Sequence, residues 1–241
     1  MKVELTYIHH NCFVLKTESR TFLFDYPNNS HLPDGAEDMV REAVAGTDLA
    51  VFISHGHDDH LNDDIISVAS SAKSVCYVLS DDVEDMRPEV VPTEGDVLIV
   101  EPDECYEFEE MKIVTLMSND LGVAFLVSDG EFRFYYGGDL AKWIWETASL
   151  QEAAFTEGFF GAAMDRAREF KPHVAFSNVD RRLPNLGGGD EACRLIQAPV
   201  FVPMHTFGNL DWLDGFRELV GDSPSELFVY SESGETSEFS F

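Results

Sequence analysis

Residues 49–61, LAVFISHGHDDHL, constrain the fold of this chain more than any other stretch. They begin with five apolar residues, and a short apolar run bounded by turn signals is typical of a buried strand. Four side chains that can bind a metal follow within six residues: His55, His57, Asp59 and His60. Side chains two positions apart in an extended segment point the same way, so His55 and His57 can share one ion. The stretch therefore predicts a metal site at the end of a buried strand.

The spacing His-x-His-x-Asp-His resembles the signature of the metallo-β-lactamase superfamily of metal-dependent hydrolases. The resemblance covers nearly the whole chain, because Asp25, the ligand loop, Gly138-Asp139 and His205 follow in the family's order. It implies an α/β (α+β) fold, a four-layer αββα sandwich of two mixed β-sheets flanked by helices. It also implies a single domain over residues 1–241. Within the superfamily the chain is similar to small, uncharacterised bacterial members and to the ascorbate-phosphate lactonase branch.

The resemblance also implies a role for each residue of the loop. His55 and His57 would bind a first metal, and Asp59 and His60 a second. Asp59 would also be catalytic, because it would hold the proton of the attacking nucleophile as well as its metal. His205 would bind the second metal.

Two aspartates have alternative interpretations. Asp25 closes a predicted strand, where it either caps a turn or, as in the resembled family, buttresses the metal-ligand loop. Asp139 follows two glycines and either caps a turn or bridges the two metals. His205 directly follows a predicted buried strand, and there it is either a core histidine with satisfied hydrogen bonds or the ligand that the resemblance implies.

One element of the family pattern is missing. The family usually supplies a third histidine to the first metal, but this chain has none between the ligand loop and His173. The strand expected over 112–117 is followed instead by Ser-Asn-Asp. Asp120 is the best substitute because it offers a charged oxygen, Asn119 comes next, and the position can also be empty. We expect one or two zinc ions, and an oxygen ligand would move the site toward manganese or iron.

Three residues are candidates for binding substrate. His10 lies at the first predicted hairpin, either on a surface turn or, as the resemblance places it, beside the metal site. Trp143 either walls a substrate pocket or belongs to the core of the following helix. Arg181 is paired with Arg182 in a chain that is poor in arginine, and it either binds an anionic group or pairs with surface carboxylates.

The charge balance limits the partners of this protein. The chain has 45 acidic and 16 basic residues, a net charge of −29. Such a surface repels nucleic acid and anionic membranes. The apolar runs are shorter than the roughly 18–20 residues of a membrane span, and the N-terminal segment lacks the apolar core of a signal peptide. The four cysteines are scattered along the sequence, and we interpret them as reduced thiols. We expect a cytoplasmic protein with a small-molecule substrate, and the oligomeric state, a homo-oligomer included, stays open.

The function that these observations predict is a metal-dependent hydrolase. In it a metal-bound hydroxide would attack an ester, lactone or phosphodiester of a small molecule. One alternative is a nucleic-acid phosphodiesterase, which the negative charge disfavours. Another is a non-catalytic scaffold with a degraded metal site, which the missing histidine supports. The redox di-iron branch of the resembled superfamily carries glutamate where His57 stands, and this disfavours a redox role.

The periodicity of the sequence predicts the order of elements. Segment 80–96 should be an irregular excursion, and the acidic tail after Ser231 should lie on the surface. Helices are expected over 36–45, 62–69, 146–170 with interruptions near Gly158 and Gly161, and 211–220. Strands are expected over 3–7, 12–15, 21–24, 49–53, 74–79, 97–100, 105–109, 111–117, 122–128, 131–136, 173–177, 199–204 and 227–230.

Overall fold

The structure is a computed structural model that describes all residues from Met1 to Phe241. The chain forms two compact units, each with its own sheet and its own helices. The first unit comprises Met1–Glu101 together with Tyr230–Phe241, and the second comprises Pro102–Val229. That residues 1–241 act as a single domain stays a prediction.

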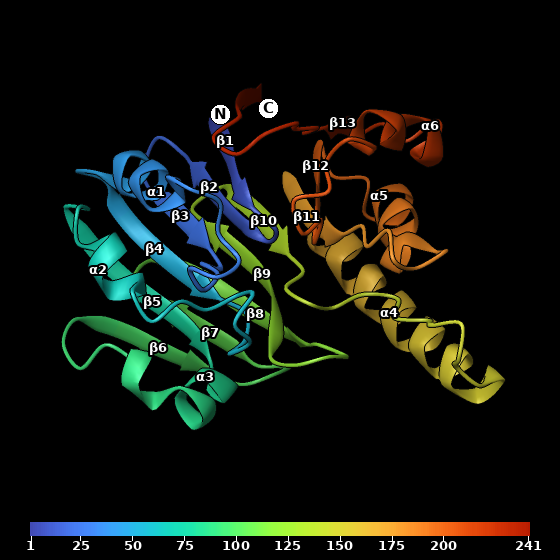
Figure 1. Ribbon diagram of the computed structural model, residues 1–241, viewed down its shortest axis with the longest axis horizontal. Coiled ribbons are helices and arrows are strands. Elements are labelled where there is room, and N and C mark those ends of the chain that lie inside the picture. Colours follow the sequence, from blue (N-terminus) through green and yellow to red (C-terminus); the bar gives the residue numbers. More distant parts are fainter. The chain divides into compact units, whose positions relative to one another are not determined.

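The first unit is built on a seven-stranded sheet in the order β14-β1-β2-β3-β4-β5-β6 (Figure 1). The β14–β1, β1–β2 and β2–β3 pairs are antiparallel, whereas β3–β4, β4–β5 and β5–β6 are parallel. The elements are β1 (Lys2–His9), β2 (Cys12–Lys16), β3 (Thr21–Phe24), α1 (Ala36–Val44), β4 (Asp48–Ile53), α2 (Ile65–Ala69), β5 (Ser74–Ser80), α3 (Asp81–Met86), the 3₁₀ turn η1 (Pro88–Val90), β6 (Asp96–Val100) and β14 (Thr236–Ser240).

Helix α1 shows why the first unit folds as it does. Ala36, Val40 and Val44 recur every four residues, which places them on one face of the helix. That face packs in the core with Val51 and Ile53 of β4, and all five side chains are buried. Burial of one valine side chain stabilises the fold by about 1.5–3 kcal/mol. The strand that carries the ligand loop is therefore fixed by the helices packed against it.

The second unit is built on another seven-stranded sheet, in the order β13-β12-β11-β10-β9-β8-β7. Pairing is antiparallel from β7 to β10 and parallel from β10 to β13. The elements are β7 (Cys105–Phe108), β8 (Met111–Met117), β9 (Val123–Asp129), β10 (Phe132–Tyr136), α4 (Leu150–Phe170), β11 (Val174–Asn178), η2 (Leu186–Gly188), α5 (Gly189–Ile196), β12 (Val200–Met204), η3 (Leu213–Gly215), α6 (Phe216–Val220) and β13 (Glu226–Leu227).

Parallel pairing brings polar strand ends together in both units. Phe24 of β3 is in register with Phe52 of β4, so Asp25 and Ser54 follow neighbouring strands. In the second unit β10, β11 and β12 are parallel neighbours, and Asp139, Asp180 and His205 follow their carboxyl ends. The carboxyl edge of a parallel sheet is where α/β proteins usually bind their ligands.

Two expectations about local structure were wrong, and two elements were not predicted. The tail after Ser231 lies largely on the surface, as expected, but it also contains strand β14, because residues 236–240 pair with β1 and bury Phe239. Helix α4 runs through Gly158 and Gly161 without a break, and a Ser149–Glu152 capping box fixes its start. Segment 80–96 contains helix α3, which Val83 anchors in the core. Residues Gly189–Ile196 form α5, which the sequence analysis did not predict.

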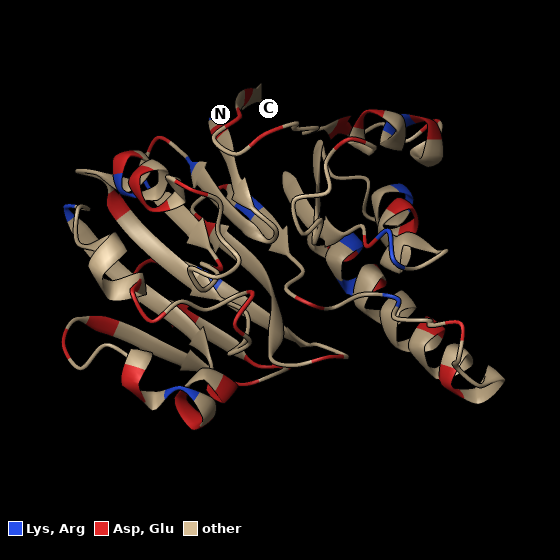
Figure 2. Cartoon of the chain, in the orientation of Figure 1, with Lys and Arg blue, Asp and Glu red and all other residues tan.

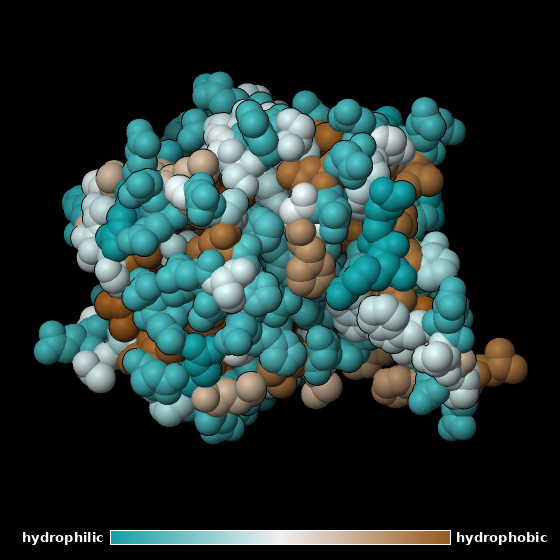
Figure 3. Space-filling model, viewed as in Figure 1, coloured by the Kyte–Doolittle hydropathy of each residue, from teal (hydrophilic) through white to brown (hydrophobic).

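The surface is strongly polar. Acidic residues occur on helices and at strand ends of both units (Figure 2), and the face seen in Figure 3 is largely hydrophilic with scattered apolar residues. None of the helices combines the length and the apolar composition that crossing a bilayer requires.

Candidate metal centre

Asp25 connects the ligand loop to the sheet of the first unit. Its Oδ1 accepts a hydrogen bond from the Ser54 backbone N–H at 2.7 Å, and its Oδ2 accepts one from the Ser54 hydroxyl at 2.7 Å. The same Oδ2 lies 2.7 Å from Nδ1 of His60. Asp25 and His60 are both buried. Because a carboxylate can only accept, Nδ1 of His60 carries the proton and Nε2 carries the lone pair that a metal would use.

The histidines of the loop gather around this anchor. Nδ1 of His55 lies 3.0 Å from the Ser54 hydroxyl. The ring centroids of His55 and His57 are 4.7 Å apart, and those of His55 and His60 are 4.0 Å apart. The backbone N–H of His60 donates to the His57 carbonyl at 3.0 Å. This hydrogen bond closes a turn over residues 57–60. The structure therefore brings His55, His57 and His60 together, as their spacing predicts.

Two residues that the sequence reading missed hold the loop from outside. Oδ2 of Asp82 in α3 accepts the N–H of Gly56 at 2.7 Å, and a Cβ at Gly56 would lie only 3.2 Å from that oxygen. Burial raises the pKa of Asp82, although hydrogen bonds partly offset this effect. Arg87 pairs with Asp58 at 3.0 Å and also with Asp63. No local motif signals these contacts, because the partners are far apart in sequence.

His10 and Asp59 face each other beside His60. Nε2 of His10 lies 3.6 Å from Oδ2 of Asp59, and Nε2 of His60 lies 3.9 Å from the same oxygen. The rings of His10 and His60 meet edge to face, with centroids 5.2 Å apart. The first hairpin thus reaches the ligand loop.

The second unit carries a matching pair, Asp139 and His205. Nε2 of His205 lies 3.4 Å from Oδ1 of Asp139, and its Nδ1 lies 3.3 Å from Oδ2 of Asp180. Burial alone would raise the pKa of Asp180, but the contacts with His205 and Arg182 lower that pKa far below its usual value. Asp180 therefore stays charged beside His205, but at 3.3 Å and without hydrogen-bond geometry it holds the imidazole less firmly than Asp25 holds His60 at 2.7 Å. The sequence analysis assigned no role to Asp180.

The position of Asp139 depends on the turn after β10. The Gly137 N–H donates to the Phe176 carbonyl at 3.1 Å, and Asn178 donates to the Gly138 carbonyl at 2.9 Å. A Cβ at Gly137 would lie 3.2 Å from that Phe176 oxygen, so the turn has little room for a side chain. Trp143 donates its indole N–H to the Asp139 carbonyl at 2.8 Å and is half-buried.

The residues of the ligand loop with His10, and separately the Asp139–His205 pair, fit a divalent metal. The donors are imidazole nitrogens and carboxylate oxygens, which zinc and similar ions bind at about 2.0–2.2 Å. Two such ligands on a tetrahedral ion lie about 3.4 Å apart. The separations of 3.4 and 3.6 Å for His205–Asp139 and His10–Asp59 agree with this spacing and exceed normal hydrogen-bond lengths. The six predicted ligands fall into two sets, one in each unit, and their union in one centre stays a prediction.

The turn between β8 and β9 holds the residues proposed to replace the missing histidine. The Asn119 side chain donates to the Ala141 carbonyl at 2.7 Å and accepts the Ala141 N–H at 3.1 Å. Its amide is therefore used to join this turn to the segment after Asp139. Asp120 is exposed, and its backbone N–H donates to the Ser118 hydroxyl at 3.2 Å. Its role as a ligand stays a prediction.

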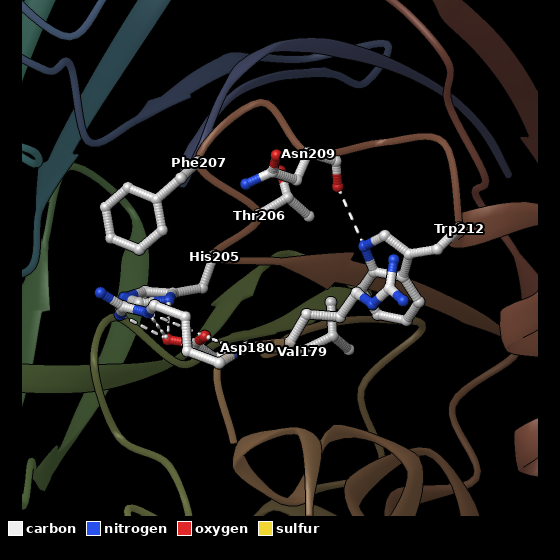
Figure 4. A pocket seen from close by; sticks show the side chains of 9 residues that line it. Val179, Asp180, His205, Thr206, Phe207, Asn209 and Trp212 are labelled. Carbon is white, nitrogen blue, oxygen red and sulfur yellow. Dashed lines mark hydrogen bonds and ion pairs between the residues drawn. The ribbon is translucent and has the colours of Figure 1, made fainter. Parts of the chain in front are cut away.

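A small cavity of about 130 Å³ lies beside His205 in the second unit (Figure 4). Trp212 forms one wall, and its indole N–H donates to the Asn209 carbonyl at 2.9 Å. The Arg181 guanidinium lies 5.5 Å from the centre of the Trp212 ring, whereas Arg182 is bound to both oxygens of Asp180. The cavity lining includes two arginines and one carboxylate, a formal charge of +1.

The sequence pattern of a family described as a beta-lactamase superfamily domain matches residues 4–154. The chain belongs to this family. A search of curated proteins finds no match.

Several solved structures share the metallo-β-lactamase fold of this chain. Igni18, a metallo hydrolase from Ignicoccus hospitalis, has a TM-score of 0.70 at 17% identity, with 100% of both chains covered. YhfI from Bacillus subtilis has a TM-score of 0.65 at 14% identity, with 99% of both chains covered. An isothiocyanate hydrolase from Delia radicum gut bacteria has a TM-score of 0.57 at 18% identity, covering 98% of this chain and 99% of the other. The predicted fold class is confirmed, and the branch within the superfamily stays a prediction.

Proposed function

We propose that this protein is a metal-dependent hydrolase of a small molecule. The observation that carries the proposal is the buried Asp25–His60 hydrogen bond, which leaves Nε2 of His60 able to bind a metal, an arrangement typical of metal-binding histidines. Asp180, at 3.3 Å from Nδ1 of His205, places a second buried carboxylate beside a predicted ligand. A scaffold that had lost its metal would gain nothing from two buried carboxylates that cost desolvation energy.

The ligands that we propose are those that the family pattern predicts. His55, His57, Asp59 and His60 would hold metal together with Asp139 and His205, as their order along the family pattern implies. The metal would supply Lewis acidity and would lower the pKa of water toward 7. Asp59 would bind metal with one carboxylate oxygen and hold the proton of the attacking water with the other. Zinc is the metal that we propose, in one or two ions, with manganese or iron as the alternatives.

The substrate would be a small ester, lactone or phosphodiester with an anionic group. Arg181 supports this proposal, because no carboxylate lies within ion-pair distance of it, whereas Arg182 is committed to Asp180. An arginine held against a tryptophan face can bind a carboxylate or phosphate with two parallel hydrogen bonds. The strongly negative charge of the chain disfavours a nucleic-acid substrate.

Metal analysis followed by a substrate panel tests the proposal. Protein purified without chelators should contain zinc or another divalent metal, and it should hydrolyse at least one of a panel of aryl esters, lactones and phosphodiesters. Asp59→Ala should lower kcat by about 10²–10⁴-fold, because Asp59 handles the proton of the nucleophile. Asp85→Ala, which removes an exposed carboxylate of α3, is the matched control. Absence of turnover in fully metallated protein would favour the scaffold alternative.

The anionic group is tested separately. With an anionic substrate of the panel, Arg181→Met should raise KM about 10-fold and leave its neutral analogue unaffected, since one charged hydrogen-bonding contact contributes about 1.5–3 kcal/mol. Arg168→Met removes the same charge from an exposed arginine of α4 that pairs with Asp165 at 2.9 Å, and it serves as the control. Equal KM values for Arg181→Met and the control would remove Arg181 from the substrate site.

A further inference from the structure

The first hairpin holds a histidine in an unusual backbone conformation. His10 has a φ of 54°, in the left-handed region that residues other than glycine seldom adopt. It follows an irregular register between Tyr7 and His9 in the β1–β2 pairing. Such conformations are strained and tend to occur at functional sites, where the surrounding structure imposes them.

Tyr7 imposes this conformation on the hairpin. The backbone N–H of His10 donates to the Tyr7 hydroxyl at 3.1 Å, in a buried position. The Tyr7 ring stacks on Tyr230, with centroids 3.8 Å apart and an angle of 19° between the planes. Its backbone is also hydrogen-bonded to Gly234 and Glu235. The turn at His10 is thus fixed from several sides, so the direction of its imidazole is defined by the fold.

The imidazole points at two predicted metal ligands. Its Nε2 lies 3.6 Å from Oδ2 of Asp59, and Nε2 of His60 lies 3.9 Å from that oxygen. A ligand atom of His10 lies within 4.8 Å of one of His60. These separations are too long for strong hydrogen bonds but suit three atoms arranged around one cation.

We propose that His10 is itself a metal ligand and binds one ion together with Asp59 and His60. The chain would thereby gain a nitrogen ligand from its first hairpin at the ion of Asp59 and His60, while the first metal would still lack the histidine that is missing after β8. His10 adds a third ligand to the ion of Asp59 and His60. That ion is therefore bound more tightly than an ion held by His55 and His57. The inference rests on the proposed function in one respect, namely that the ligand loop binds metal.

The test compares two neighbouring histidines. His10→Asn removes the imidazole but keeps the turn, because asparagine tolerates a positive φ. His9→Asn is the matched control at the adjacent, half-buried end of β1. Zinc affinity is measured by competition with a chromophoric chelator, and unfolding in urea verifies that both variants fold. We expect His10→Asn to weaken the tighter zinc site about 100-fold or more, the upper end of the effect of partners that only orient a ligand. We expect His9→Asn to match the wild type.

Cobalt-loaded protein gives a second readout that does not depend on activity. Each imidazole bound to cobalt contributes a strongly shifted, exchangeable N–H proton resonance, and His10→Asn should lose one that His9→Asn retains. If His10→Asn does not fold, Tyr7→Phe takes its place, since it removes only the hydroxyl that fixes the turn and should weaken zinc several-fold.

Three results would overturn the proposal. Unchanged zinc affinity in the folded variant, or an unchanged set of shifted resonances, would show that His10 is not a ligand while leaving the proposed hydrolase intact. A wild-type protein that binds neither zinc nor cobalt would refute both the inference and the proposed function.

Discussion

Asp25→Asn should change which nitrogen of His60 carries the proton. The new amide would have to keep its oxygen on the Ser54 backbone N–H, because that group can only donate. Its NH₂ group would then face the Ser54 hydroxyl and Nδ1 of His60, which lie at the other oxygen in the wild type. Both can accept, so Nδ1 of His60 would lose its proton and Nε2 would gain it. The nitrogen that should bind the metal would then be protonated.

The size of the effect follows from the contacts of Asp25. Asp25→Asn keeps a partner for every donor, so the free energy of unfolding should fall by only about 1 kcal/mol. Metal affinity should fall about 10–100-fold, the usual cost of losing the group that orients a metal-bound histidine. Asp25→Ala leaves three buried donors without an acceptor and should lower the free energy of unfolding by about 3–5 kcal/mol.

Three measurements test this reasoning. Chelator competition gives the zinc affinity, urea titration gives the stability, and ¹⁵N chemical shifts of the imidazole report which nitrogen of His60 is protonated. Asp48→Asn, at the partly exposed start of β4, makes the same substitution on a carboxylate that binds only Ser74 and Lys73. Wild-type zinc affinity in Asp25→Asn, with Nδ1 of His60 still protonated, would refute the argument.

Three further predictions concern the loop, the second unit and its main helix. Arg87→Met should weaken zinc binding by up to about 10-fold and raise proteolytic cleavage between residues 56 and 64, because it releases Asp58 and Asp63; equal cleavage in the wild type would contradict this. Asp120→Ala should lower metal stoichiometry from two toward one, as measured by elemental analysis, and unchanged stoichiometry and affinity would exclude Asp120 as a ligand. Ser149→Ala should lower the free energy of unfolding by about 1 kcal/mol through loss of the α4 cap, as measured in urea. The hydrogen bond from the Ser149 backbone lowers the pKa of Glu152, so the stabilisation by this carboxylate is complete above about pH 4.3 and is lost as the pH falls through the lowered pKa.

The sequence predicts the local part of the candidate site well. His55, His57 and His60 lie in one loop, so their spacing and the strand before them define where they point. The order of strands brings Asp139 and His205 to one edge of a sheet, and this too can be read from the pattern of buried strands.

The supporting residues could not be predicted in the same way. Asp82, Arg87 and Asp180 act through contacts with distant segments or with neighbouring turns, and each resembles the many other charged residues of this chain. Strand β14 escaped notice because its single buried side chain, Phe239, stands among polar residues. Helix α4 passes through Gly158 and Gly161 although each glycine costs roughly 1 kcal/mol, and its buried residues, Phe160, Ala163, Met164 and Ala167, all come after Gly158.

Strand β14 makes the assembly of the first unit depend on the order of synthesis. Strand β1 is made long before its partner at residues 236–240, which follows every other strand and helix described above. In the interval β1 has an open edge, and unpaired strand edges invite pairing with other chains. The same late segment supplies Tyr230 and Glu235 to Tyr7, whose hydroxyl holds the His10 turn. A nascent chain would therefore complete the ligand-bearing end of its first hairpin only after residues 230–240 have been made, and a change that disturbs β14 would also disturb the His10 turn.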